Sequence, residues 1–323
     1  MRRRDFVAFL SGAAAWVAAA QAQEPRHVIG FLGEVSLSSP RALEAFYQGL
    51  KETGFVEGKN LSIEFRGAGG QYDHLPSLAA ELVARNVSVI VAYDLPSAFA
   101  AKEATKTIPV VFGVGADPVK LGLVDSFNRP RGNLTGVTTL LGSLGPKQLE
   151  LLRELLPNSN KVALLLNPSN PNAQIDTPEI QAAADALGER LEVLTASTES
   201  ELETSFTTSV GQGVHALVVK PDPLFMSLRE RLVALAAHHA IPAIYSHREF
   251  VELGGLMSYG GTRLDAYRQI GMYTGRILKG ERPADLPVQQ SIKFDLVINL
   301  KTAQVLGLTV PPELLARADE VIE

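Results

Sequence analysis

Short apolar runs alternate with longer amphipathic stretches along most of the chain. Residues 28–32 form the first apolar run, which predicts a strand that is buried on both faces. In residues 41–52, the apolar side chains Leu43, Phe46 and Leu50 recur at spacings of three and four, which places them on one face of a helix. An alternating order of strands and helices is typical of a parallel sheet with helices on both faces. The pattern therefore predicts an α/β fold.

The alternation restarts near residue 140, which predicts two similar Rossmann-like lobes, and 323 residues is the length of about two domains. We expect the first lobe to hold residues 23–140 with about 262–285, and the second lobe to hold residues 141–261 with about 286–323. The late segments are too short for a third domain, so they must pack back on the lobes and form a hinge of several strands. Further strands are expected at residues 61–65, 87–91, 109–112, 162–166, 191–194, 216–219, 242–245, 256–260 and 294–299, and further helices at 75–85, 96–104, 146–155, 179–187, 199–210, 226–237, 264–278 and 301–306.

The first 22 residues have the three regions of a signal peptide in order. The arginines at positions 2–4 precede an apolar, alanine-rich stretch at residues 7–20, and small residues flank Gln21. The paired arginines followed by Asp5 resemble a twin-arginine signal. A retained membrane anchor is the alternative, but the apolar stretch of about 14 residues is shorter than the roughly 20 that span a bilayer. We expect cleavage after Ala22 and a periplasmic mature protein.

Composition narrows the possible functions. Hydrophobic residues are 46% and charged residues 20% of the chain, as in ordinary soluble proteins. The net charge of −5 becomes about −7 once the signal peptide is removed, and an acidic protein is a poor match for nucleic acid. The chain has no cysteine, which excludes disulfides, zinc–thiolate sites and cysteine nucleophiles.

The sequence predicts neither a metal site nor a cofactor site. None of the six histidines forms an i, i+4 pair, and the adjacent His238 and His239 would point about 100° apart on a helix. Gly113-Val114-Gly115 lacks the third glycine of a dinucleotide-binding loop. Nucleophile elbows and phosphate-binding loops are also missing, so we expect no enzyme active site.

Small, polar and aromatic residues follow the predicted strands, where open parallel sheets bind ligands. Several of these positions also begin helices, whose free N–H groups favour anions. Ser39 and Ser97 could instead serve only as helix caps, and Tyr245 and Tyr259 could pack in the hinge rather than stack on a ligand. The candidate ligand-binding residues are Ser38, Ser39, Asp94, Ser97, Ala116, Asp117, Asn167, Asn170, Asn172, Asp222, Tyr245 and Tyr259.

Five segments together resemble the ABC transporter substrate-binding family that includes tryptophan- and tyrosine-type binding proteins. They are Asp-Pro-Val at 117–119, Asn-Leu-Thr-Gly-Val at 133–137, Gly-Leu-Met-Ser-Tyr-Gly at 255–260, Ile-Asn-Leu-Lys-Thr-Ala at 298–303 and Ala-Arg-Ala-Asp-Glu-Val-Ile at 316–322. The resemblance covers essentially the whole mature chain.

The resemblance implies a type I periplasmic-binding fold whose two lobes close on a ligand and then dock on a permease pair with a cytoplasmic ATPase. It also implies that residues 94–97, 115–117 and 167–172 hold the ligand. In this sequence the first of these loops reads Asp-Leu-Pro-Ser, in place of the small Thr-Pro-Ala type of loop in the aromatic amino-acid binders.

These observations predict the extracytoplasmic solute-binding component of an ABC importer. We expect a monomer that binds an amino acid or an aromatic or carboxylate-like solute between its lobes, without a cofactor, and that works with ABC permease and ATPase subunits. Two alternatives remain open at this point. One is a ligand sensor that presents its closed form to a membrane receptor kinase, and the other is an exported enzyme that uses Asp94, Asp117 or Asp222.

Overall fold

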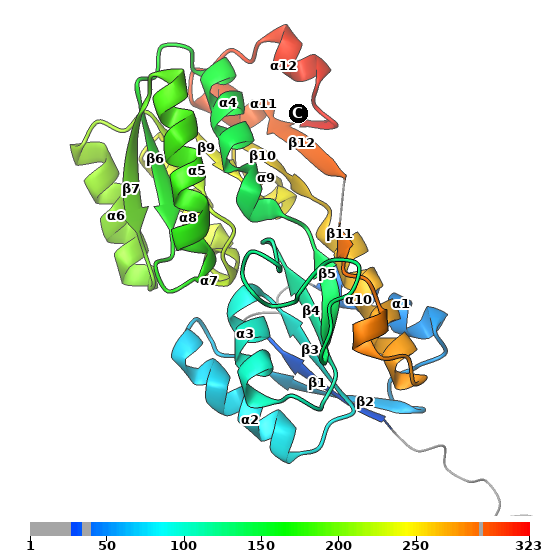
Figure 1. Cartoon of the computed structure of the whole chain (residues 1–323). Helices are drawn as coiled ribbons and strands as arrows, with labels where there is room; N and C mark the ends of the chain where they lie inside the picture. Colours follow the sequence, from blue (N-terminus) through cyan, green and yellow to red (C-terminus); the bar gives the residue numbers. More distant parts are fainter. Residues whose placement is uncertain (1–26, 34–39, 291–292) are drawn as a thin grey trace, which may run out of the picture.

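The computed structural model describes residues 27–33, 40–290 and 293–323 and shows two α/β lobes, one above the other (Figure 1). The predicted signal peptide, Ser38 and Ser39 lie outside the described residues. No helix in the described part of the chain is both long enough and apolar enough to cross a membrane.

The first sheet has the strand order β11-β5-β4-β3-β1-β2, and all its neighbouring strands are parallel. β4 and β5 lie inside the sheet and are buried throughout, because helices cover both faces. This burial explains why the strands read as continuous apolar runs in the sequence. The strands are β1 (His27–Leu32), β2 (Leu61–Arg66), β3 (Val89–Tyr93), β4 (Val110–Val114), β5 (Leu134–Thr138) and β11 (Gln289–Gln290).

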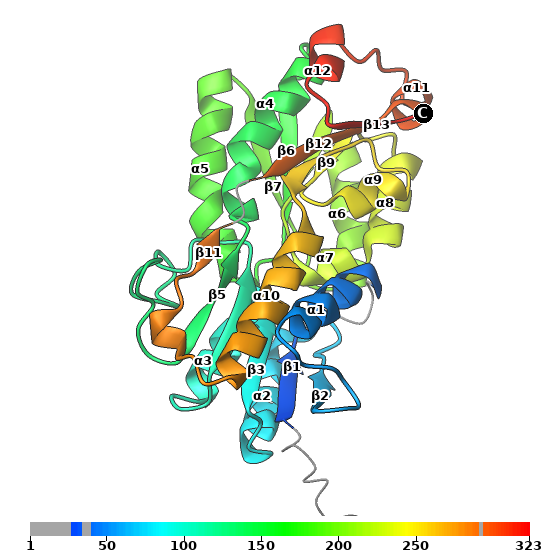
Figure 2. The same ribbon diagram turned by 90° about the vertical axis from the view of Figure 1, so that its right-hand side faces the viewer.

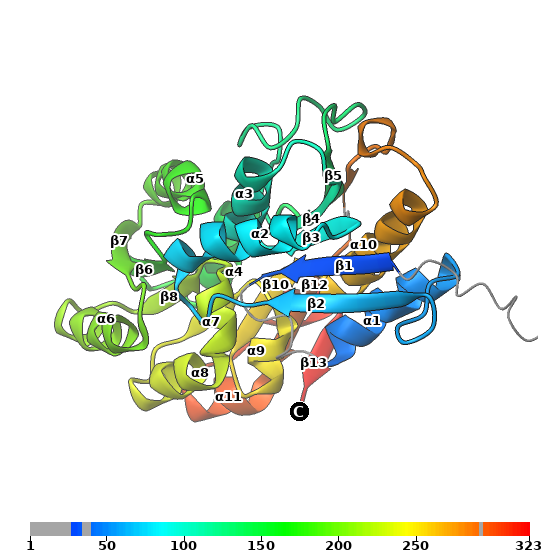
Figure 3. The ribbon, with the colours of Figure 1, turned by 90° about the horizontal axis from the view of Figure 1, so that it is seen from below.

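Two pairs of helices cover the first sheet. α2 (Leu75–Ala84) and α3 (Leu95–Ala104) pack on one face, and α1 (Pro40–Glu52) and α10 (Arg263–Leu278) pack on the other. Seen from below, β1 and β2 lie between α2 on one side and α1 on the other (Figure 3). Short 3-10 helices at Tyr72–His74 (η2) and Pro283–Asp285 (η4) complete this lobe.

The second sheet has the strand order β13-β12-β10-β9-β8-β6-β7. Only the β10–β12 pair in this sheet is antiparallel. The 3-10 helix η3 (Leu141–Leu144) leads into this lobe. The strands are β6 (Lys161–Leu166), β7 (Arg190–Thr195), β8 (Ala216–Val219), β9 (Ala243–Tyr245), β10 (Met257–Gly261), β12 (Phe294–Asn299) and β13 (Glu320–Ile322), and the helices are α4 (Gly145–Leu155), α5 (Asn172–Leu187), α6 (Glu199–Gly211), α7 (Pro223–Ser227), α8 (Arg229–His238), α9 (Arg248–Glu252), α11 (Leu300–Val305) and α12 (Pro312–Ala316).

The chain passes between the two sheets three times, after β5, after β10 and after β11. The last passage lies beyond residue 290, because β11 pairs with β5 of the first sheet and Leu286 is buried in the first lobe. The sequence placed that boundary near residue 285. Two other differences concern helices: α5 begins at Asn172 and runs through Pro178, where the sequence predicted a start near 179, and the helix expected at 226–237 is divided into α7 and α8.

α1 and α10 cross in close contact, side by side along the first lobe (Figure 2). A Cβ atom added to Gly49 would lie 2.0 Å from the carbonyl oxygen of Arg268, and one added to Gly271 would lie 2.2 Å from the carbonyl oxygen of Phe46. Both distances are far inside van der Waals contact and both neighbours are backbone atoms, so the two helices approach this closely only because these positions carry glycine. The contact fixes a late segment of the chain to an early one.

We expect Gly271→Ala to lower the free energy of unfolding by about 1–3 kcal/mol, because the added methyl group forces α1 and α10 apart. Gly211→Ala is the matched control, since a Cβ at this helical position meets no atom within 4 Å. It should leave stability unchanged or raise it by up to about 1 kcal/mol. Chemical denaturation of both variants checks this, and equal stabilities would contradict the close crossing.

Candidate functional site

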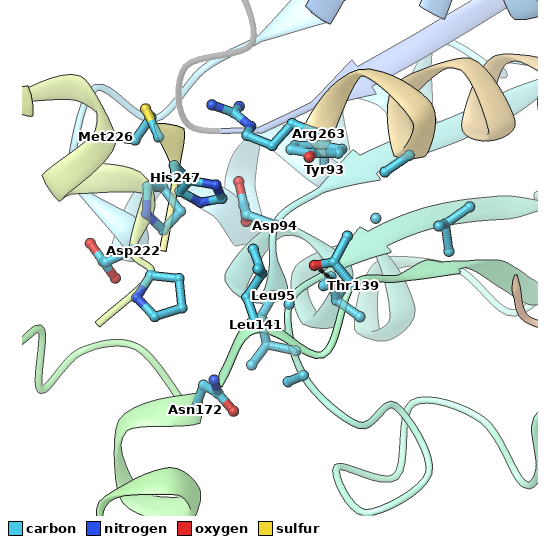
Figure 4. A pocket seen from close by; sticks show the side chains of 18 of the residues that line it. Tyr93, Asp94, Leu95, Thr139, Leu141, Asn172, Asp222, Met226, His247 and Arg263 are labelled. Atoms are coloured by element: carbon cyan, nitrogen blue, oxygen red, sulfur yellow. Dashed lines mark hydrogen bonds between the residues drawn. The ribbon is translucent and has the colours of Figure 1, made fainter. Parts of the chain in front are cut away.

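A cavity with a volume of about 110 Å³ lies between the two lobes (Figure 4). One buried water needs about 10–15 Å³ on a comparable scale, so the cavity has room for a small organic molecule. Residues from the strand ends of both sheets and from the first turns of α10 surround it. They are Tyr93, Asp94, Leu95, Gly113, Val114, Gly115, Ala116, Val137, Thr139, Leu141, Asn170, Asn172, Pro221, Asp222, Pro223, Met226, His247, Arg263, Ala266 and Tyr267.

Asp94 follows β3 and begins α3 at the edge of the cavity. Its carboxylate accepts a hydrogen bond of 2.7 Å from the backbone N–H of Ser97, which caps the helix. Its backbone has φ 151° and ψ 166°, a region that residues other than glycine rarely occupy. Such strain costs about 1–3 kcal/mol and is concentrated at functional sites. The strained turn holds the Asp94 carboxylate at the cavity wall.

Asp222 is the centre of a buried hydrogen-bond network in the second lobe. Its carboxylate accepts hydrogen bonds from the side-chain amides of Asn167 at 3.2 Å and Asn170 at 2.8 Å, and from the backbone N–H of Leu224 at 2.9 Å. Burial raises the pKa of Asp222, while these donors act in the opposite direction by stabilising the charged form. A buried carboxylate with several donors is held in one position.

A fourth donor to Asp222 comes from the other lobe. The hydroxyl of Tyr72, in η2, donates to Oδ1 of Asp222 over 2.9 Å. Burial, followed by the charge of Asp222, raises the pKa of Tyr72, so its hydroxyl keeps its proton. A second bridge between the lobes, more exposed, is the ion pair of Lys120 with Glu179 at 3.5 Å. Both contacts connect the first lobe to the second.

The first turns of α10 form another wall of the cavity. The rings of Tyr93 and Tyr267 lie with centroids 3.9 Å apart, and the guanidinium of Arg263 lies over both rings at 5.8 and 5.7 Å. Arg263 also pairs with Glu249 of α9 over 3.4 Å, which joins the two lobes. Figure 4 shows Arg263 and Tyr93 along the same side of the cavity.

His247 faces this wall from the second lobe. Its Nδ1 is buried and has no hydrogen-bond partner among the described residues. Burial lowers the pKa of His247 to about 4, and the positive charge of Arg263 acts in the same direction. The imidazole is therefore neutral at pH 7 and presents an unpaired polar atom beside the cavity.

The structure brings together five of the residues that the sequence proposed: Asp94, Ala116, Asn170, Asn172 and Asp222 all line the cavity. The other described candidates lie outside its lining. Ser97 is buried in α3, Asp117 caps the following turn by accepting from the N–H groups of Val119 and Lys120, and Asn167 positions Asp222.

The two tyrosines proposed to stack on a ligand are also outside the lining. Tyr245 is fully buried and stacks on Phe250 with centroids 4.6 Å apart, and Tyr259 packs against the core of the second lobe. Tyr93, Tyr267, Arg263 and His247 line the cavity without having been proposed. Tyr93 ends β3, one position before the proposed Asp94. The expectation that ligands bind at strand ends could therefore have included Tyr93.

The described residues contain no group of three or more His, Asp or Glu side chains placed to hold a metal ion. The polar residues of the cavity carry carboxylates, amides, hydroxyls, one guanidinium and one imidazole, distributed over both lobes. Such a set can hydrogen-bond and neutralise a small polar molecule.

Residues 32–322 match the family described as ABC transporter substrate binding protein. The chain belongs to this family. A tyrosine-binding protein from Clostridioides difficile (strain R20291) is 30% identical over 275 residues, which are 84% of this chain and 78% of that protein. The sequence-based family resemblance is thereby confirmed.

Solved structures show the same fold for this substrate-binding protein. A conserved domain protein from Vibrio cholerae has a TM-score of 0.83 at 31% identity and covers 91% of this chain and 99% of its own. An ABC domain from Streptococcus pneumoniae in complex with L-Trp has a TM-score of 0.80 at 29% identity, covering 92% and 100%. The ligand-free, open structure of a substrate-binding protein from Clostridium difficile has a TM-score of 0.63 at 27% identity, covering 92% and 99%. The predicted two-lobed type I periplasmic-binding fold is confirmed.

We expect His247 to make the stability of the folded protein depend on pH. Because the pKa of His247 is about 4 in the folded state and about 6.5 when exposed, the unfolded chain binds more protons between these values. The stabilisation is therefore complete above about pH 6.5 and is lost as the pH falls towards 4, by up to about 3 kcal/mol.

Denaturation of the wild type and of His247→Asn at pH 7 and pH 4.5 measures this. The variant should lose less stability on acidification than the wild type, because Asn does not titrate in this range. His215→Asn, at an exposed position, is the control and should behave as the wild type does. Equal losses in the wild type and in His247→Asn would show that the imidazole does not carry the effect.

Proposed function

We propose that the protein is the extracytoplasmic solute-binding component of an ABC importer and that it closes its two lobes on a small amino-acid-like solute. The observation that carries the proposal is a single cavity lined by strand ends from both sheets. A solute in this position contacts both lobes at once, so it stabilises the closed form relative to the open form. The passages between the sheets are the hinge that permits closure.

The cavity chemistry favours a zwitterion with a largely apolar body. The Asp94 carboxylate is suited to an ammonium group, and the Arg263 guanidinium to a carboxylate. Val114, Val137 and Leu141 supply apolar contact area. The relatives described as binding tyrosine and L-Trp support an aromatic amino acid as the solute.

The described conformation has the features of a closed form. The Tyr72–Asp222 hydrogen bond and the Lys120–Glu179 ion pair both span the lobes. The likeness to the L-Trp complex, with a TM-score of 0.80, exceeds the likeness to the open, ligand-free relative at 0.63, although the identities are similar at 29% and 27%. Both observations support closure around a solute as the mechanism.

The proposal includes export and transfer. The N-terminal pattern supports a twin-arginine signal peptide that is cleaved after Ala22, which would place the mature protein in the periplasm. Membership of the ABC transporter family supports a permease and an ATPase as partners of a monomeric binding protein. The cavity is assigned to binding and release, with no chemical step.

We expect L-tryptophan or L-tyrosine to raise the melting temperature and to reduce the radius of gyration in solution scattering. A ligand at 100 times its Kd stabilises a folded protein by about 2.7 kcal/mol.

Asp94→Asn should weaken amino-acid binding at least about tenfold, because Asn can still cap α3 but cannot neutralise an ammonium group. Asp125→Asn, at an exposed acid, is the control. Binding without compaction would contradict closure, and failure of every amino acid to bind would contradict the solute class.

We expect Tyr72→Phe to weaken the binding of every solute by a similar factor of about 10–100. Its hydrogen bond to the Asp222 carboxylate joins the lobes only in the closed form, and a hydrogen bond to a charged group is worth about 1.5–3 kcal/mol. Tyr273→Phe removes a hydroxyl that bonds to the carbonyl oxygen of Pro287 within the first lobe, so it should not change affinity. Calorimetric titration of both variants with two solutes checks this. A loss confined to one solute would mean that Tyr72 contacts the ligand instead.

A further inference from the structure

Gly113 and Gly115, at the end of β4, both line the cavity. Glycine stands at these two positions for different reasons. A Cβ on Gly113 would lie 2.5 Å from Cδ1 of Ile270 and 2.6 Å from Cδ2 of Tyr93. Neither neighbour has room to move, because Ile270 of α10 is fully buried and the ring of Tyr93 packs against that of Tyr267. The packing of the first lobe therefore requires glycine at position 113.

Gly115 is not required by the fold. Its φ lies outside the left-handed range that favours glycine, and an added Cβ would meet only Cβ of Leu141 at 3.5 Å and Oγ1 of Thr139 at 3.9 Å. These are ordinary van der Waals distances, so an alanine side chain would fit the backbone without strain. The missing side chain leaves space that the protein itself does not fill.

That space belongs to the cavity. Gly115, Leu141 and Thr139 all line it, so a side chain at position 115 would project between two cavity-wall residues. Figure 4 shows Leu141 and Thr139 on one side of the cavity and Asp222 on the other. Val114 and Ala116 adjoin Gly115 in the chain, and the second lobe contributes the amide and carboxylate groups of Asn170, Asn172 and Asp222 to the lining.

We propose that residue 115 determines how large a solute side chain the protein accepts, and that glycine at this position adapts the cavity to a bulky, aromatic side chain. This inference rests on the proposed amino-acid-like solute. The ammonium and carboxylate groups of the solute would pair with Asp94 and Arg263, as proposed above, and its side chain would lie over the backbone of Gly115. One additional methyl group in such a pocket changes discrimination by a factor of about 10–200.

The test compares the wild type, Gly115→Ala and Gly115→Val by calorimetric titration with L-tryptophan, L-phenylalanine and L-alanine. Wild-type affinity should increase with the size of the side chain. Gly115→Ala should weaken the binding of L-tryptophan by about tenfold or more, and Gly115→Val should weaken it further. Neither variant should weaken the binding of L-alanine to a comparable extent. Gly211→Ala, far from the cavity lining, is the matched control and should bind as the wild type does.

Thermal melting of each variant separates selectivity from folding, and the wild-type size series tests the inference even if Gly115→Val does not fold. A wild type that prefers L-alanine, or a Gly115→Ala variant that binds L-tryptophan unchanged, would overturn the assignment of residue 115 and leave amino-acid binding in place. The absence of any amino-acid binding by the wild type would overturn the proposed function, and this inference with it.

Discussion

The close contact between α1 and α10 is the constraint on which the cavity depends. α10 begins at Arg263, immediately after β10 of the second sheet, yet it packs on the first lobe because Gly49 and Gly271 allow the two helix backbones to approach. The same first turns of α10 carry Arg263, Ala266 and Tyr267 into the cavity wall. A change in the helix contact would therefore displace cavity residues as well as the hinge, so packing of the first lobe and geometry of the binding site are not independent.

Sequence patterns predicted the inner strands well because these strands are buried on two faces, which produces apolar runs such as 110–114 and 162–166. Helix limits were less predictable: the sequence predicted a helix from about residue 179, but α5 begins at Asn172 and accommodates Pro178 in its interior. At the site, the expectation that ligands bind beyond the strand ends identified Asp94 and Asn170. The direction of the parallel strands alone places these residues at the cavity. The same expectation could not identify Arg263 or Tyr267, because tertiary contacts of α10, rather than the local sequence, determine their position at the cavity.

Asp222 is a buried charge at the contact between the lobes, and its donors fit the proposed opening and closing. Three of its four donors, the amides of Asn167 and Asn170 and the N–H of Leu224, belong to the same lobe, and only Tyr72 belongs to the other. In the proposed opening of the lobes, the carboxylate would keep three donors and gain water, so opening would not leave an uncompensated buried charge. The cross-lobe bond can then favour closure by a limited amount without preventing release of the solute.

In the proposed mechanism, the buried polar atoms beside the cavity offer a reason why closure would need a solute. Nδ1 of His247 and the hydroxyl of Tyr267 are both buried without a hydrogen-bond partner among the described residues, and an unpaired buried polar group costs about 1–3 kcal/mol. In an open form water can reach groups that line the cleft, so this cost falls on the closed form alone. Under the proposed function, a solute that pairs with these atoms as the lobes close would remove this cost. In this proposal, the Tyr72–Asp222 bond favours the closed form and the unpaired polar atoms of an empty cavity disfavour it. A bound solute would shift the balance by changing the second contribution.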